Sequence, residues 1–91
     1  MLKVPDTFRK LGFTYTKLAS RGSWRVYAQE RNGRVASYET VEPNIQKVGE
    51  HFGKMYPTYE TYPSAEEWGT HGFTETNRGL AMAMLASRGS N

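Results

Sequence analysis

The sequence predicts a single α+β domain over residues 1–91, in which an antiparallel sheet of three or four strands packs one face against a C-terminal helix. We also expect a short N-terminal helix. Three observations predict this fold: two β-rich runs flank Asn32-Gly33, an apolar stripe with helical spacing follows Asn77, and 91 residues suit one small domain.

The centre of the predicted sheet is a hairpin. The runs SWRVYAQER and RVASYETVE are separated by Asn32-Gly33, the pair that best tolerates the two positive φ angles of a type I′ turn. A two-residue loop pairs Tyr27 with Tyr38, Trp24 with Val41 and Arg31 with Arg34. The last pair is repulsive, so we expect this end of the hairpin to fray.

Alternation along the first of these strands separates two faces. Trp24, Val26 and Ala28 share one face, whereas Arg25, Tyr27 and Gln29 share the other. We assign the first set to the core, against the C-terminal helix. A register error of one residue would reverse this assignment.

The regions that flank the hairpin are less regular. Pro5 and Gly12 can begin and end a helix, which predicts a short helix from about residue 5 to residue 11. The run FTYTKLA at 13–19 is typical of a strand, with a turn over 20–23. After Pro43 we expect a strand, a glycine-containing connection over 49–53, and an extended run broken by Pro57 and Pro63.

A capping box and a short strand are expected next. Ser64 and Glu67 have the spacing at which each side chain can bond to the other residue's backbone amide, so a single helical turn should begin at Ser64. Gly69 can end that turn. The run GFTET at 72–76 is a short strand or an extended link.

The C-terminal helix is predicted from Arg78 to about Ser87, with Asn77 as its N-cap and Gly89 as its stop. Its apolar stripe is broad, and Met82 lies nearly opposite Leu80. Either two sides of the helix are therefore covered, or Met82 belongs to an interface, or it is an isolated exposed methionine.

Composition excludes several kinds of protein. The chain has no cysteine, so it has no disulfide framework, thiolate nucleophile or sulfur-ligated zinc. Its start lacks the apolar stretch of a signal peptide, and no run approaches the ~18 apolar residues of a membrane span. We expect a cytoplasmic protein without a membrane partner. Only 37% of residues are apolar, so the core is small, and a homodimer would cover a spare apolar face.

Charge is distributed unevenly along the chain. Residues 1–38 hold eight cationic and two acidic side chains, whereas residues 39–77 hold two cationic and seven acidic ones. Such asymmetry can steer a charged partner, provided that the charges also gather in space.

No residue pattern predicts catalysis. The only imidazoles are His51 and His71, which could meet Glu50, Glu67 or Glu75 in a metal site or an acid–base pair. Their spacing encodes neither, and we interpret both as structural or solvent-exposed. The chain also lacks a Gly-x-Ser-x-Gly elbow, a phosphate loop and a dinucleotide fingerprint. We predict a protein that is not an enzyme and has no catalytic residues, metal or cofactor.

A tyrosine-rich segment is the first candidate binding site. Its tyrosines recur every three residues around two prolines, a pattern that shows rings on more than one side of an extended chain. With neighbouring glutamates they would form a protein-recognition patch of Tyr56, Tyr59, Glu60, Tyr62, Glu66 and Glu67. The alternative is a flap that seals the core with Tyr59 and Trp68.

The hairpin is the second candidate. Arg25, Tyr27, Arg31, Arg34 and Tyr38 could gather on one face, with cations for phosphates and rings for base stacking. The alternative is a solvated sheet face on which the tyrosines merely cover the strands.

The strand SYETV and the later run YPSAEEWGTHGFTETN resemble a group of small uncharacterised proteins from bacteriophages and other mobile elements. In that group a Tyr-Glu-Val strand precedes a Tyr-Pro-Ser-x-Glu-x-Trp-Gly-x-x-Gly-Phe-Thr-like segment. The likeness covers about residues 35–86. Matching positions are Tyr38, Glu39, Tyr62, Pro63, Ser64, Glu67, Trp68, Gly69, Gly72, Phe73 and Thr74, whereas Thr40 replaces the usual aliphatic residue.

The resemblance implies origin and fold and offers no catalytic residues. By analogy with anti-CRISPR and other anti-defence inhibitors, we expect a non-enzymatic protein that binds and inhibits or modulates a host protein or protein complex. The alternative is a small nucleic-acid-binding module that uses the basic hairpin.

Overall fold

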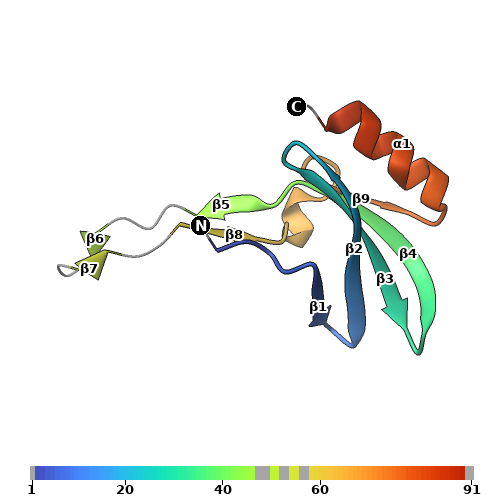
Figure 1. Ribbon diagram of the computed structural model, residues 1–91, viewed down its shortest axis with the longest axis horizontal. Helices are drawn as coiled ribbons and strands as arrows, with labels where there is room; N and C mark the ends of the chain where they lie inside the picture. The colour runs from blue at the N-terminus through green and yellow to red at the C-terminus, as the bar shows by residue number, and fades with distance from the viewer. Residues whose placement is uncertain (1, 47–49, 52–53, 56–57, 90–91) are drawn as a thin grey trace.

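The computed structural model describes residues 2–46, 50–51, 54–55 and 58–89 (Figure 1). Within these ranges the elements run in the order β1 (Thr7–Lys10), β2 (Phe13–Arg21), β3 (Trp24–Arg31), β4 (Arg34–Val41), β5 (Asn44–Gln46), β6 (Glu50–His51), β7 (Lys54–Met55), β8 (Tyr59–Thr61), the 3-10 turn η1 (Ala65–Glu67), β9 (Gly72–Glu75) and α1 (Arg78–Arg88).

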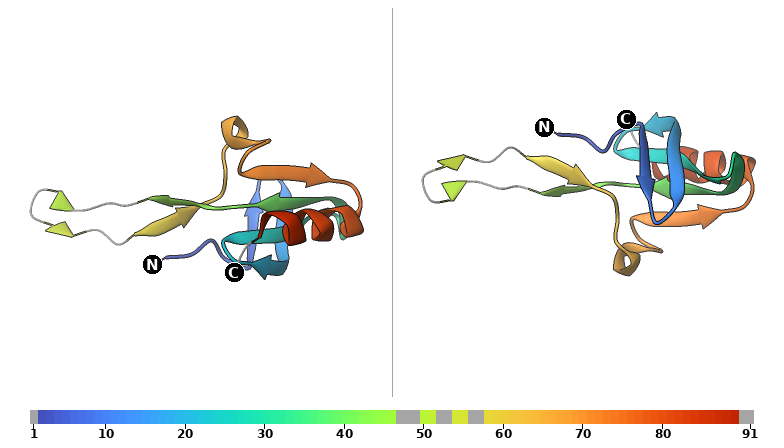
Figure 2. Two further views of the ribbon diagram at one scale, coloured as in Figure 1. Left: turned by 90° about the horizontal axis from the view of Figure 1, so that it is seen from above. Right: turned by 90° about the horizontal axis from the view of Figure 1, so that it is seen from below.

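The main sheet is antiparallel and has the strand order β1-β2-β3-β4-β9. The predicted α+β class, with the C-terminal helix on one face of the sheet, is confirmed. The sheet has five strands instead of three or four, because β1 and β9 add its two edges. The paired strands β5 and β8 form a separate ribbon that extends away from this sheet, with β6 and β7 beyond it (Figure 2).

The predicted N-terminal helix is wrong. Residues 7–10 form β1, and Leu11 and Gly12 form a turn with positive φ angles of 52° and 82°. Gly12 suits this turn as well as a helix end, and Pro5 lies before β1. The strand is favoured because it stacks Phe8 on Tyr15 with ring centroids 4.9 Å apart, a cross-strand contact that outweighs local propensity.

The predicted hairpin turn is confirmed, and its register is partly wrong. Asn32 and Gly33 both have positive φ, and Arg31 pairs with Arg34. A β-bulge then leaves Ala36 without a partner, so Tyr27 faces Glu39 and not Tyr38. Trp24 likewise does not pair with Val41, whose partner is Arg25. Downstream of the bulge every β4 side chain changes sheet face relative to the prediction.

The face of β3 that carries Trp24, Val26 and Ala28 is buried, as predicted. Ala81 and Leu85 pack on it. Figure 1 shows α1 beside the sheet. Tyr38 joins this helix-side core because the bulge moved it there.

The ends of α1 agree with the sequence. Asn77 Oδ1 accepts a hydrogen bond from the Leu80 amide at 3.2 Å, and Gly89 is the C-cap. Met82 is half-buried against the helix-side core, whereas Leu80 is 56% exposed. The exposed apolar side chain of this helix is thus Leu80, and the interpretation of Met82 as an isolated exposed residue is wrong.

The opposite sheet face, which we expected to be solvated, is also buried. Tyr27 is fully inaccessible and lies in an aromatic cluster of Phe8, Tyr15, Tyr27, Tyr62 and Trp68. The Phe8 and Tyr27 rings are 5.3 Å apart although β2 separates their strands, so the sheet curves around the cluster. Tyr62 reaches into it from outside the sheet, with ring centroids 5.3–5.7 Å from those of Phe8, Tyr15 and Tyr27.

The segment over residues 64–75, which follows Tyr62, has the structure that its local sequence signals predict. Glu67 Oε1 accepts a hydrogen bond from the backbone amide of Ser64, as in a capping box, and a second bond from the Ser64 hydroxyl, and η1 follows. Gly69 ends the turn with a φ of +93°, and β9 confirms the strand alternative for 72–76.

We predict that Tyr62→Ala lowers the free energy of unfolding by about 3 kcal/mol, because it removes a ring from the middle of the aromatic cluster. Tyr59→Ala is the matched control. Tyr59 is 37% exposed, and its loss should change stability by less than about 0.5 kcal/mol. Urea unfolding of both variants measures the difference, and equal stabilities would contradict the role given to Tyr62.

Candidate functional site

The described tyrosines of the predicted binding patch do not share one environment: one packs in the core and one is partly exposed. The flap interpretation named Tyr59 and Trp68; Trp68 does pack on the aromatic cluster, but the tyrosine beside it is Tyr62, and Tyr59 is partly exposed on β8. Tyr56 lies outside the described residues. Within the described part of the segment, Tyr59 is the tyrosine left partly exposed for a partner, at 37%.

The glutamates of the predicted patch also differ in burial and in their hydrogen bonds. Glu60 accepts two hydrogen bonds from Arg25 at 2.7 and 2.8 Å and a third from the Val4 amide at 3.0 Å. This ion pair is buried, with side chains 12% and 10% exposed. Burial disfavours the charged Arg25, but its hydrogen bonds, chiefly to Glu60, more than offset this, and the pKa of Arg25 is raised. The pair ties β8 and the N-terminal segment to β3.

Glu66 and Glu67 lie side by side in η1 but have different surroundings. Glu67 accepts a hydrogen bond from Asn44 as well as those from Ser64, and these bonds lower its pKa. Glu66 is exposed. Of the three predicted glutamates, Glu66 is the one that the described contacts leave free for a partner.

The structure does not gather the predicted basic hairpin residues on one face. Arg25 and Tyr27 are engaged in the ion pair and the aromatic cluster, and Tyr38 faces the helix side. Arg31 and Arg34 remain exposed at the end of the hairpin.

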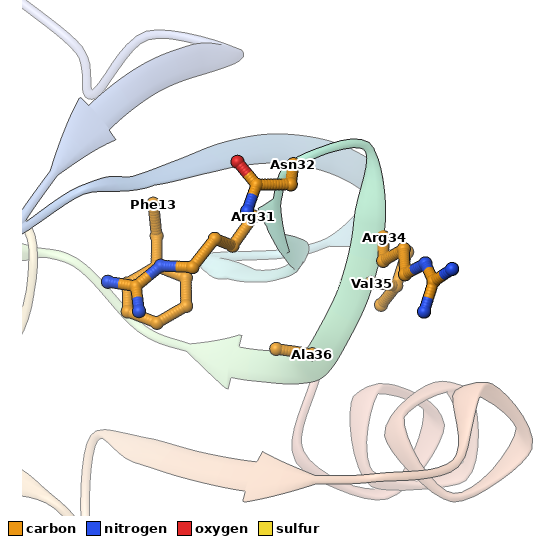
Figure 3. A pocket seen from close by; sticks show the side chains of 6 residues that line it. All are labelled: Phe13, Arg31, Asn32, Arg34, Val35 and Ala36. Carbon is orange, nitrogen blue, oxygen red and sulfur yellow. The ribbon is translucent and has the colours of Figure 1, made fainter.

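Arg31 and Arg34 line a hollow of about 660 Å³ together with Phe13 and Val35 (Figure 3). The Arg31 guanidinium lies over the Phe13 ring, 4.1 Å from its centroid, whereas Arg34 points the other way. This divergence explains why both strands remain paired out to the facing arginines, contrary to the fraying that we expected.

The hollow belongs to a larger basic surface, which we call the turn end. It comprises the turn between β1 and β2, the turn between β3 and β4, and their flanking residues (Figure 1). The two turns lie close together, as a distance shows: a Cβ atom placed on Gly12 would be 3.1 Å from the Arg31 guanidinium. Its exposed cations are Arg9, Lys10, Arg31 and Arg34.

Exposed aliphatic side chains accompany these cations. Leu11 is 82% exposed and Val35 is 45% exposed. By register the nearest carboxylate is the half-buried Glu30, which pairs with Val35. Part of the charge asymmetry of the sequence is therefore real in space. We did not identify Leu11 from the sequence, because its segment was predicted to be a helix and is instead a turn.

A second surface feature is a groove of about 430 Å³ beside Tyr62, which we call the aromatic groove. Its lining includes Tyr15, Trp68, Lys10 and the carboxylate of Glu39. The Tyr62 hydroxyl donates to Glu39 Oε1 at 2.6 Å. Burial raises the pKa of Glu39 above its ordinary value, although the Tyr62 bond and Lys10 oppose this, and burial also raises the pKa of Tyr62. Sequence reasoning did not identify Glu39, because the bulge decides which face it occupies.

In the described part of the chain, His71 contacts one carboxylate and does not belong to a group of metal ligands. His71 Nδ1 lies 2.9 Å from Glu42 Oε1, and Glu42 Oε2 accepts the Ser23 hydroxyl at 2.6 Å. This links the β2–β3 turn to the residue before β9. Only the backbone of His51 is described. Among the described residues no three carboxylate or imidazole side chains converge as metal ligands would.

The chain matches no protein-family model, and no curated protein or solved structure is significantly similar to it. No helix in the described ranges is long and apolar enough to cross a membrane.

The buried ion pair gives one prediction. Arg25→Met keeps an apolar stem but leaves Glu60 charged and without its main donor, so stability should fall by about 3 kcal/mol. Arg34→Met, at an exposed position, is the control and should change stability by less than about 0.5 kcal/mol. Thermal and urea unfolding check both values, and a stable Arg25→Met protein would contradict the anchoring role.

Glu39 gives a second prediction, in the pH dependence of stability. Because its folded pKa is raised, the folded state holds a proton that the unfolded state has released, and stability falls as pH rises through this window. Glu39→Gln cannot ionise. The variant should therefore gain stability relative to wild type as the pH rises above the ordinary glutamate pKa of about 4.3. Tyr15 and Tyr62 also face Glu39, and burial raises the pKa of both phenols, away from this range. Urea unfolding at several pH values measures the difference, which the hypothesis requires to grow with pH.

Proposed function

We propose that this protein is a non-enzymatic binding protein that attaches to a host protein or protein complex in the cytoplasm and inhibits or modulates it. The resemblance to small phage and mobile-element proteins supports this class of function. The observation that carries the proposal is the turn end, where Arg31 and Arg34 stand beside exposed Leu11 and Val35. We infer that its target presents an acidic surface.

The composition of the turn end favours a protein over a nucleic acid. Arginine next to apolar side chains is typical of the energetic centre of protein interfaces. Single-stranded nucleic acid instead requires free aromatic faces for stacking. At the turn end, one face of Phe13 is covered by Arg31, while Tyr27 and Tyr38 are packed in the two cores.

A charge-reversal pair tests the proposal. Arg31→Glu with Arg34→Glu should reduce retention of the host partner roughly 30-fold or more, as loss of a hot-spot arginine does. Lys3→Glu with Arg78→Glu makes the same change in net charge at exposed positions outside the turn end, and should retain the partner. The measurement is affinity purification from host lysate with each tagged variant, followed by titration against the identified partner. Equal retention by both variants would refute a role for the turn end.

Salt dependence separates the protein target from the nucleic-acid alternative. If the four cations of the turn end neutralised four phosphates of duplex DNA, log affinity would fall against log salt with a slope of roughly −3.6. We expect no such binding to labelled duplex or single-stranded oligonucleotides at low salt. A steep slope that the Arg31/Arg34 reversal abolishes would replace the protein partner with nucleic acid.

A further inference from the structure

The aromatic groove differs from an ordinary surface hollow because a buried carboxylate lines it. Glu39 is only 8% exposed. Its Oε1 accepts the Tyr62 hydroxyl, whereas Oε2 receives no hydrogen bond from any residue that the structure describes. No fully buried side-chain polar atom in the described part of the chain lacks a partner, so Oε2 keeps accessible surface, and Glu39 lines the groove. A desolvated carboxylate oxygen in this position favours a cationic partner.

The rings around Glu39 are held in position before any ligand arrives. Tyr62 lies between Tyr15 and Trp68, with centroids 5.7 and 6.3 Å away. The Trp68 indole N–H donates to Thr74 Oγ1 at 2.8 Å, which fixes the orientation of that ring. Aromatic faces beside a carboxylate attract cations by two interactions, one with the ring quadrupole and one with the carboxylate charge.

Lys10 already shows this attraction within the molecule. Its Nζ lies 5.3 Å from the Tyr62 ring centroid, at the groove. Its side chain is exposed, so a ligand that makes better contacts can displace it. Lys10 is thus a competitor for the same site.

We propose that the aromatic groove binds the guanidinium group of an arginine side chain presented by a partner protein. The guanidinium is planar and weakly hydrated, so it can stack on Tyr62 or Trp68 while donating to Glu39 Oε2. A lysine ammonium is a more strongly hydrated point charge and stacks less well. This site does not depend on the function proposed for the turn end.

The probe is N-acetyl-arginine N-methylamide, titrated into the full chain at pH 8, well above the ordinary glutamate pKa of about 4.3. Proton–nitrogen NMR of the Trp68 indole N–H reports on the groove, and Trp24→Phe assigns that signal because the chain has only two tryptophans. We expect a millimolar Kd for this single side chain, and at least tenfold weaker binding of the matching citrulline derivative, which has the same shape without charge.

Two variants locate the interaction. Glu39→Gln should weaken binding of the arginine probe at least tenfold, because it removes the charge and keeps the side-chain shape. Lys10→Met should tighten binding several-fold, because it removes the competing cation from an exposed position and does not alter the core. If Glu39→Gln fails to fold, Lys10→Met carries the test.

Three outcomes would overturn the proposal. They are equal binding of the arginine and citrulline derivatives, an affinity that Lys10→Met leaves unchanged, and tighter binding of the corresponding lysine derivative. Because the probes are small molecules and the readout is Trp68, these outcomes are independent of whether the turn end binds a host partner.

Discussion

The fold depends on how the second face of the sheet is covered. The sheet has two faces and the described part of the chain supplies one α-helix, which packs on the side of Trp24 and Val26. On the other side, the sheet curves around its own aromatic rings and Tyr62 closes the space between them. Large rings suit this task because each buries about 150–250 Å², so a few of them replace a second helix. A chain with few apolar residues can thereby protect both faces of its sheet.

This solution constrains where polar groups can lie. Tyr62 carries a hydroxyl into the cluster, and Glu39 receives it, so the aromatic face includes a buried carboxylate. The Arg25–Glu60 pair plays a corresponding role at the edge of the cluster, where it fastens β8 to β3. Side chains that the sequence suggests for catalysis or binding therefore stabilise the fold. The groups left for recognition are the exposed cations of the turn end, the free oxygen of Glu39 and partly exposed residues such as Tyr59.

Signals confined to a few neighbouring residues predicted structure well. The Asn32-Gly33 turn, the Ser64–Glu67 capping box and the Asn77 cap depend on local geometry, and each is present. Features decided by distant partners were not predictable. Strand β1 is held in the aromatic cluster by contacts of Phe8 with Tyr27 and Tyr62, and Arg25 is largely buried because it meets Glu60, 35 residues away. The bulge at Ala36 has no local signature, yet it decides that Glu39 and not Tyr38 faces Tyr27. The candidate site changed for that reason: the tyrosines of the hairpin went into the cores, and a glutamate entered the groove.

The turn end and the aromatic groove adjoin, because Lys10 and Leu11 belong to the first and also line the second. Their charges are opposite, so a partner that fits both must present carboxylates beside an arginine. Exposed cations act at long range and increase the rate of encounter, whereas a preorganised groove acts only in contact and fixes orientation. In the proposed complex, an arginine that entered the groove would displace Lys10, which would then be free to meet the acidic surface around it. The two sites would thus reinforce each other on one target and discriminate against a uniformly acidic polymer, which has no cation for Glu39.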